Sequence, residues 1–169
     1  MSSSVNPGKR ATGRSAGPAA SGAAGAKEQE IAAALARIPS GLFVLTARHE
    51  ERRVGLLTRM VQQVCHRPAM VCVAVAKGSP IMPLISESRQ FGLCQLGEGD
   101  KLLMRKFGGE VDPGEDPFLG FELLPSVLPG LPLLAQCHAP LECALSCHMD
   151  VEGDHDLFVG VVRAGRWRG

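Results

Sequence analysis

Three groups of side chains in this sequence have the residue types that metal binding or catalysis requires. In the first group, Cys143, Cys147 and His148 are close in sequence, and Cys137 and His138 are just upstream. Zinc is commonly bound by cysteine and histidine. Apolar and polar residues alternate here, which predicts a strand that holds Cys143 and Cys147 about 13 Å apart. Two thiolates of one tetrahedral zinc must each lie about 2.3 Å from the metal. We therefore predict no metal site and interpret these cysteines as small core residues.

The second group is Cys65 with His66, which have the chemistry of a nucleophile and its base. Neighbours on a strand point to opposite faces, so adjacency does not make this pair catalytic. The third group is His155, which lies between Asp154 and Asp156 at the start of an apolar stretch. An acid beside a histidine at a ligand adjusts its protonation, but a solvent-exposed turn histidine would have the same sequence. The sequence leaves both interpretations open.

One polar stretch, GLLTRMVQQVCHRP at residues 55–68, separates two apolar ones. It begins as a strand and then carries Thr58, Arg59, Gln62 and Gln63 without the composition of a loop. A hydroxyl, a guanidinium and two amides along one line suit an elongated ligand with an anionic end and a heteroaromatic end. A solvent-exposed edge strand explains the same residues equally well. Elsewhere the sequence has no glycine-rich phosphate loop and no nucleophile elbow, and its loop GEVDPGEDPFLG is acidic and would repel phosphate.

Periodicity and turn residues predict the elements that position these side chains. Six or seven strands against two or three short helices indicate a mainly β (α+β) fold, an antiparallel barrel whose helices cover its openings. The apolar stretch MVCVAVA is expected to be a central strand with both faces buried. Ser79 is expected to cap the helix that follows it. The expected helices are 27–38, 81–87 and 100–109, the strands are 41–47, 54–61, 70–76, 90–96, 139–151 and 154–165, and short edge segments are 121–126 and 131–136.

The amino-acid composition indicates how the chain divides into a tail and a domain, and it argues against a nucleic-acid partner. Residues 1–26 are rich in Ser, Gly and Ala and are predicted to be a disordered tail, which leaves residues 27–169 as one domain. The tail partly resembles a transit peptide. Its three basic residues exceed the net charge of +1, so the domain is mildly acidic and no nucleic-acid partner is expected. No apolar run is long enough to cross a membrane. Six scattered cysteines favour a reducing compartment and a cytoplasmic protein without disulfides.

Five stretches resemble the flavin reductase-like family in their order and spacing. They are IPSGLFVLTA, GLLTRMVQQ, MVCVAVAKGSPIMPLISESRQFGLCQL, LLMRKFGG and GDHDLFVGVV, which together cover residues 30–164. The resemblance implies an FMN-binding split β-barrel with Greek-key topology that forms a homodimer. It also implies an oxidoreductase that is an NAD(P)H-dependent flavin reductase and transfers hydride to flavin N5, with FAD as the alternative flavin. No catalytic acid or base is then required, because the cofactor carries the chemistry.

The resemblance also implies which residues contact the flavin. The polar strand would lie along the isoalloxazine edge and the ribityl phosphate, and the next turn would bind the phosphate. His155 would lie near the flavin or the nicotinamide. The expected cofactor-binding residues are Thr58, Arg59, Met60, Gln62, Gln63, Cys65, Lys77, Ser79 and His155.

Two departures from the family pattern keep other functions open. Arg59 and Met60 stand where relatives commonly have small residues, and His66 and Arg67 also differ. The chain ends at RWRG, where the family usually continues with another strand, so its C-terminal strand is expected to be truncated. One alternative is a non-catalytic FMN-binding electron-transfer module fed by a redox partner protein. Another is a barrel that has lost its flavin and acts through protein contacts.

Overall fold

The computed structural model describes residues 18–110, 112 and 114–168, and it divides between Pro39 and Ser40 into two units. In the first unit, helix α1 spans Pro18–Leu35. It therefore begins and ends earlier than the helix predicted at 27–38.

Residues 18–26, which the sequence analysis assigned to a disordered tail, belong to this helix in the structure. This stretch is rich in alanine, whose helix propensity is the highest of all residues and offsets the cost of the glycines. The prediction for residues 1–17 falls outside the described residues.

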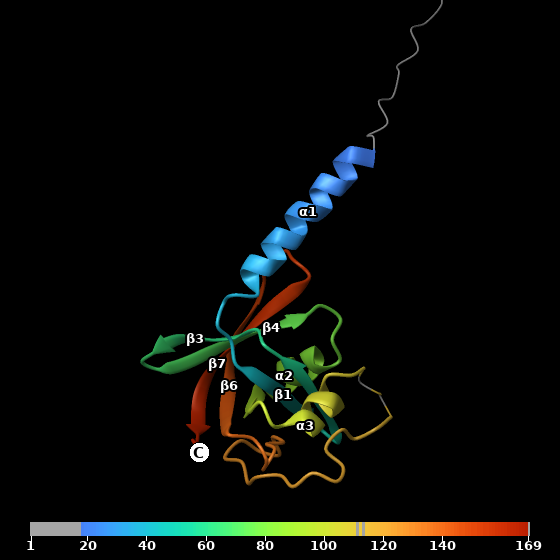
Figure 1. Cartoon of the computed structure of the whole chain (residues 1–169). Helices are drawn as coiled ribbons and strands as arrows, with labels where there is room; N and C mark the ends of the chain where they lie inside the picture. The colour runs from blue at the N-terminus through green and yellow to red at the C-terminus, as the bar shows by residue number, and fades with distance from the viewer. Residues whose placement is uncertain (1–17, 111, 113, 169) are drawn as a thin grey trace, which may run out of the picture. The chain divides into compact units, whose positions relative to one another are not determined.

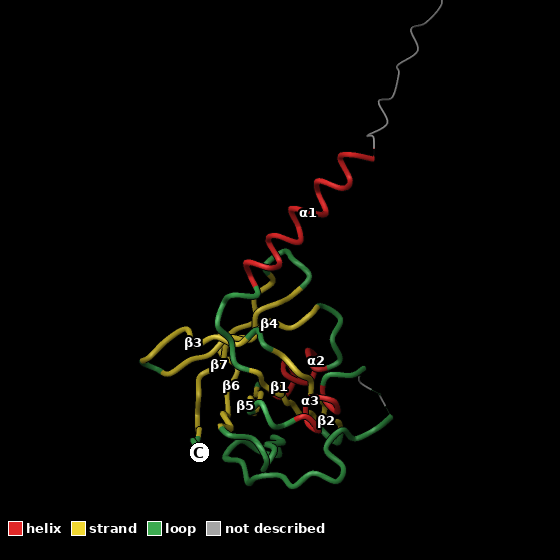
Figure 2. The backbone as a smooth tube through the Cα atoms, in the orientation of Figure 1, coloured by secondary structure: helices red, strands yellow, loops and turns green. Residues whose placement is uncertain are grey.

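The second unit is built on one seven-stranded antiparallel sheet (Figures 1 and 2). The mainly β architecture with short helices is therefore confirmed. The two further helices are α2 (Ile81–Ser88) and α3 (Lys101–Phe107). The strands are β1 (Leu42–His49), β2 (Arg52–Thr58), β3 (Val61–His66), β4 (Ala69–Ala76), β5 (Gln90–Leu96), β6 (Ala139–Asp150) and β7 (His155–Gly165).

The order of the strands explains how the sheet becomes a barrel. The order is β2-β1-β5-β6-β7-β4-β3, so the two outer strands are β2 and β3. These two strands are consecutive in the chain, and only Arg59 and Met60 separate them. Two residues span only a few ångströms, so the end of β2 lies close to the start of β3. The backbone N–H of Ala74 on β4 donates to the carbonyl of Met60 at 3.0 Å, which continues the pairing of β3 with β4.

Two apolar clusters hold the barrel together. The first lies inside the barrel, includes the buried rings of Phe91 and Phe158, and is extended by Ile81 and Ile85 of α2. The second includes Phe107 of α3 and forms against the other face of β1 and β5. Alternate residues of β1 enter the two clusters, as a strand with both faces covered requires.

A buried carboxylate fixes one loop to the sheet. Glu142 on β6 is 6% exposed, and one of its oxygens accepts three hydrogen bonds. The donors are Ser126 Oγ at 2.5 Å, the Val127 N–H at 2.8 Å and the Leu128 N–H at 3.1 Å. Buried charge is tolerated only when it is paired or hydrogen-bonded in this way.

Three other predictions differ from the structure. The predicted strand 54–61 ends at Thr58, because β3 begins a separate pairing with β4. The strand 70–76 is not buried on both faces: β4 alternates between buried valines and more exposed residues, and it has β7 and β3 as neighbours. The predicted edge segments 121–126 and 131–136 meet only in a single bridge between Leu123 and Leu134.

Candidate functional site

The junction between β2 and β3 presents a cation to solvent. Thr58 Oγ accepts a hydrogen bond from the Met60 N–H at 3.1 Å, and the Val61 N–H donates to the Arg59 carbonyl at 2.9 Å. These two local bonds fix the turn, and the side chains of Arg59 and Met60 are exposed. Within the described part of the chain the Arg59 guanidinium forms no ion pair. It can therefore bind an external anion without first breaking a contact.

The strand after this junction, β3, has one unpaired edge. It pairs with β4 alone, and Gln62 and Gln63 are exposed whereas Cys65 is half-buried. The amide of Gln62 donates to the Gln63 carbonyl at 3.2 Å, and the amide of Gln63 donates to the Cys65 carbonyl at 3.3 Å. An unpaired edge offers rows of backbone N–H and C=O groups. This edge therefore presents backbone and amide groups together to a planar ligand.

Lys77 lies at the end of β4 and is engaged by two carboxylates. Its Nζ is 2.7 Å from Asp150 Oδ1 and 3.6 Å from Asp156 Oδ1. The hydrogen bond with Asp150 raises the pKa of Lys77 and lowers the pKa of Asp150, which the Glu152 N–H lowers further. Lys77 is therefore a firmly charged ammonium, but a phosphate must compete with these two carboxylates to bind it.

Ser79 and His155, the other residues expected near the phosphate and the ring, lie at the same end of the barrel. His155 is the register partner of Ala76, and its Nδ1 is 2.8 Å from Asp154 Oδ1. This hydrogen bond lowers the pKa of Asp154. Ser79 is half-buried and is not the helix cap that the sequence predicts, because Pro80 holds the N-cap position of α2.

The sequence did not indicate a pair that faces Lys77. His148 Nε2 on β6 lies 2.7 Å from Asp156 Oδ2 on β7, and the imidazole stacks on Phe158 with ring centroids 4.3 Å apart and planes 9° apart. The register of the β6–β7 hairpin brings them together, since it aligns His148 with Phe158 and Asp150 with Asp156. Acidic and histidine residues at alternating positions of two successive predicted strands are the only sequence signal of this pair.

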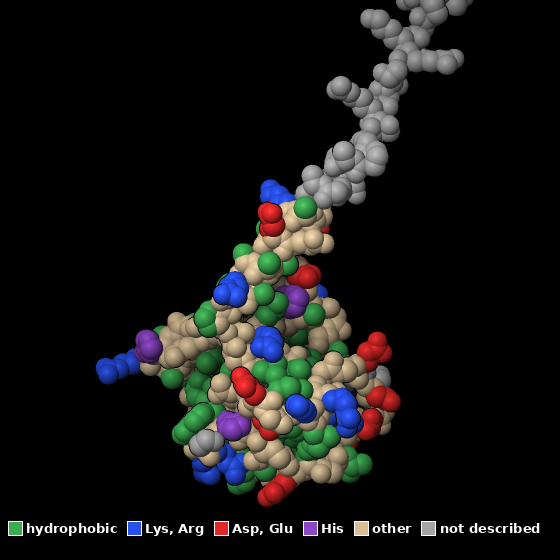
Figure 3. Space-filling model, in the orientation of Figure 1, with side chains coloured by type: hydrophobic (Ala, Val, Ile, Leu, Met, Phe, Trp, Pro, Cys, Tyr) green, Lys and Arg blue, Asp and Glu red, His purple; other side chains and the backbone are tan. Residues whose placement is uncertain are grey.

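The predicted residues form a band, not one enclosed pocket. Thr58 to Met60 lie beside Ala74 of β4, and Lys77 lies about 10 Å further along at 3.3 Å per residue. Gln62, Gln63 and Cys65 extend in the opposite direction towards the tip of the β3–β4 hairpin. In Figure 3 this hairpin carries Arg and His colours at its tip, where His66 and Arg67 are exposed.

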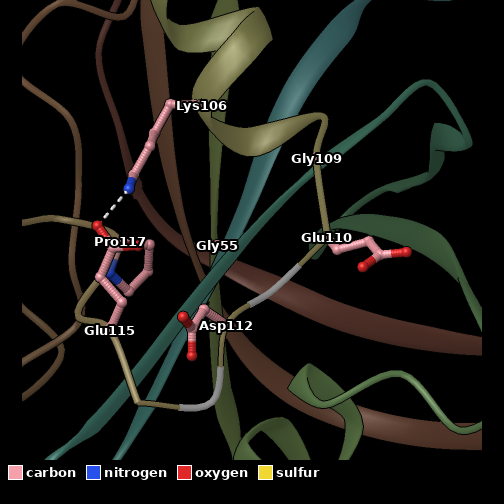
Figure 4. A pocket seen from close by; sticks show the side chains of 7 residues that line it. All are labelled: Gly55, Lys106, Gly109, Glu110, Asp112, Glu115 and Pro117. Atoms are coloured by element: carbon pink, nitrogen blue, oxygen red, sulfur yellow. Dashed lines mark hydrogen bonds and ion pairs between the residues drawn. The ribbon is translucent and has the colours of Figure 1, made fainter.

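A separate small cavity contains none of the predicted residues (Figure 4). It holds about 30 Å³, which is the space of one water molecule and not of a ring system. Lys106 on its wall pairs with Glu115 at 2.8 Å. The remaining charged lining residues, Glu110 and Asp112, are acidic, so this cavity does not suit a phosphate.

The profile of the flavin reductase like domain family matches residues 35–169, which include every strand of the barrel. The chain belongs to this family. Membership supports a flavin-binding oxidoreductase, and the split β-barrel that the sequence resemblance implied is confirmed. No helix among the described residues is both long and apolar enough to cross a membrane.

The curated relatives of this domain are much longer proteins. "Putative diflavin flavoprotein A 3" of Nostoc sp. is 35% identical over 134 residues, which are 79% of this chain and 23% of the relative. "Diflavin flavoprotein A 1" of Synechocystis sp. is 32% identical over 140 residues, which are 82% of this chain and 24% of the relative. The chain therefore spans about a quarter of the length of these relatives.

Solved structures share the fold over most of their length. The NADH:FAD oxidoreductase SgcE6 of Streptomyces globisporus has a TM-score of 0.75 at 24% identity, and the match covers 83% of this chain and 82% of that one. The styrene monooxygenase flavin reductase of Pseudomonas putida has a TM-score of 0.69 at 26% identity, with 82% and 86% covered.

Proposed function

We propose that the chain binds FMN along the band from Thr58 to Cys65 and reduces it with NADH or NADPH. The observation that carries this proposal is the unpaired polar edge of β3, which begins at an exposed guanidinium that has no ion pair in the described chain. FAD is the alternative flavin. SgcE6 supports the nicotinamide donor, since one of its structures is a complex with NAD and FAD fragments.

The donor set of this band fits a flavin. Arg59 offers charge-assisted hydrogen bonds to a phosphate. Backbone groups of the β3 edge and the amides of Gln62 and Gln63 match the donors and acceptors on the edge of an isoalloxazine ring. The exposed side chain of Met60 supplies apolar surface for a ring face.

The bound flavin would accept a hydride at N5. The residues of this chain would orient the ring and the nicotinamide and exclude water between them. His155, held by Asp154 at 2.8 Å, is proposed to contact the flavin or the nicotinamide. Ser79 and Lys77 are proposed to assist at the phosphate, although Lys77 must first leave its carboxylates.

A second copy of the chain is proposed to cover part of this band. Met60 and Val64 are 57% and 51% exposed, and a second copy would cover this apolar surface along the β3 edge. We place this homodimer in a reducing compartment such as the cytoplasm, where the buried thiols of Cys94, Cys137 and Cys143 stay reduced.

The lengths of the relatives favour a second candidate, an electron-transfer module that receives electrons from a partner protein. About three quarters of each "diflavin flavoprotein" lies outside the match, and the name indicates a second flavin in those proteins. In such an arrangement the flavin of this domain would exchange electrons with a neighbouring domain or protein.

Flavin absorbance and anaerobic reduction test these proposals. The desalted protein incubated with FMN should retain about one flavin per chain and bleach when NADH or NADPH is added without oxygen. Retention without bleaching would support the electron-transfer module, and no retention would overturn both. Arg59→Gln should weaken FMN binding about tenfold and riboflavin binding hardly at all, because only FMN has the phosphate. Arg52→Gln, which removes an exposed arginine from β2, is the matched control.

A further inference from the structure

One oxygen of a buried carboxylate near Lys77 has no hydrogen-bond partner. Asp156 on β7 is 6% exposed, and its Oδ2 is bonded to His148 Nε2 at 2.7 Å. Its Oδ1 is buried and has no hydrogen-bond donor among the described residues, and Lys77 Nζ lies 3.6 Å away. A buried carboxylate oxygen without a donor is costly. Asp156 therefore attracts the nearest mobile cation, which is the Lys77 ammonium.

Lys77 lies between two carboxylates that differ in their exposure to solvent. Asp150 makes the shorter contact at 2.7 Å, but its side chain is 63% exposed, so water screens this ion pair. The side chain of Asp156 is only 9% exposed, so its charge is screened much less. Asp150 is the stronger partner, since its hydrogen bond is the main cause of the raised pKa of Lys77, and Asp156 adds a second, less screened charge that opposes an anionic ligand.

Charged groups of both hairpin strands surround Lys77. His148 and Asp150 come from β6, and Asp156 and His155 from β7. The turn between these strands adds two exposed acids, Glu152 and Asp154. The carboxylates outnumber the single ammonium and oppose a phosphate.

We propose that Asp156 and His148 determine how readily Lys77 accepts the phosphate of a flavin, with Asp156 as the positioning residue and His148 as its hydrogen-bond partner. This inference rests on the proposed flavin site and adds a specificity determinant to it. The charge of Asp156 holds Lys77 back from the phosphate, and the His148 contact reduces this hold because it occupies the second oxygen of Asp156.

The preference for FMN over riboflavin measures this effect, because the two ligands share the ring and differ only in the phosphate. Dissociation constants are obtained from the quenching of flavin fluorescence at pH 7.5 and low salt. Asp156→Asn should raise the preference for FMN about tenfold, since it removes one poorly screened negative charge. Glu152→Gln changes the net charge equally on the exposed turn and should change the preference less than about twofold. In a Lys77→Gln background the Asp156→Asn gain should vanish.

His148→Gln tests the second part of the proposal at the same pH. It removes the ring nitrogen that lies 2.7 Å from Asp156, so Asp156 should hold Lys77 more strongly. The preference for FMN should therefore fall about threefold. This variant also decides the matter if circular dichroism shows that Asp156→Asn is unfolded.

The outcomes separate this inference from the function on which it rests. If the wild-type protein binds neither flavin, the proposed flavin site is wrong, and this inference falls with it. If the wild-type protein binds both flavins, an Asp156→Asn preference equal to that of wild type overturns this inference alone. So does a gain that persists without Lys77, or a preference of His148→Gln equal to that of wild type.

Discussion

Replacement of Cys143 by alanine should reduce the loss of stability at alkaline pH. Cys143 is fully buried on β6. Burial, and then the neighbouring charge of Glu142, raises the pKa of its thiol from 9.0 to about 12. As the pH rises past 9.0, the unfolded chain releases this proton whereas the folded chain keeps it. Because folding raises the pKa of this thiol, the thiol stabilises the folded protein below pH 9.0. This stabilisation is lost progressively as the pH rises from 9.0 towards 12.

The size of the effect follows from the two pKa values. Between pH 8 and pH 10 the thiol destabilises the folded state by about 1.4 kcal/mol, the free energy of one pKa unit. Cys143→Ala should lack this contribution, so its free energy of unfolding should fall by about 1.4 kcal/mol less than that of wild type. Urea unfolding followed by far-UV circular dichroism at pH 8, 9 and 10, in the presence of a reductant, measures both. The chain contains no tyrosine, so phenol groups do not add to the slope.

Cys147 provides the matched control on the same strand. It is exposed, so Cys147→Ala should keep the wild-type dependence on pH. The hydrogen bond with Cys137, and then burial, also raises the pKa of the Cys94 thiol, but this thiol is present in all three proteins and cancels in the comparison. If Cys143→Ala loses as much stability between pH 8 and 10 as wild type, burial does not keep this thiol protonated and the reasoning is refuted.

Three further changes test the loop contact, the packing and the dimer. Glu142→Ala removes the acceptor of three hydrogen bonds and should lower the free energy of unfolding in urea by about 3 kcal/mol. The control, Glu122→Ala at an exposed position, should lower it by less than about 0.5 kcal/mol. Gly160→Val places a Cβ 2.7 Å from a buried ring and should cost at least about 2 kcal/mol; Gly153→Val, with open space around it, should shift the melting temperature far less. Val64→Lys should shift a dimer to monomers in analytical ultracentrifugation if the exposed β3 edge is the interface, and an unchanged dimer would exclude it.

The local parts of the fold could be predicted from the sequence because local residues determine them. Strand β5 was predicted at its observed bounds, 90–96, and α2 within one residue of its observed end. Gly, Pro and polar residues bracket both segments. Helix α1 begins at Pro18 and not at the predicted residue 27. The predicted start relied on low apolar content, which measures the capacity of a segment to form a core and not its helix propensity.

The long-range parts could not be predicted in the same way. The end of β2 at Thr58 depends on β3 pairing with β4, and no residue between Gly55 and Cys65 signals a break. The polar band could be proposed from the sequence because most of its side chains are contiguous in sequence. The contact between His148 and Asp156 was missed because it depends on the register of a hairpin with two irregularities in its pairing.

The two outer strands of the sheet, β2 and β3, are joined by the two-residue link Arg59–Met60 and by no ladder among the described residues. Every pair of neighbouring strands is joined by a ladder of backbone hydrogen bonds, and the bond from the Ala74 N–H to the Met60 carbonyl extends the ladder between β3 and β4. Widening the gap between the two outer strands therefore parts no ladder. The compliance of the barrel is therefore concentrated at the position where the ring of a ligand is proposed to lie, so ligands of different thickness can be accommodated without any strand changing its partner.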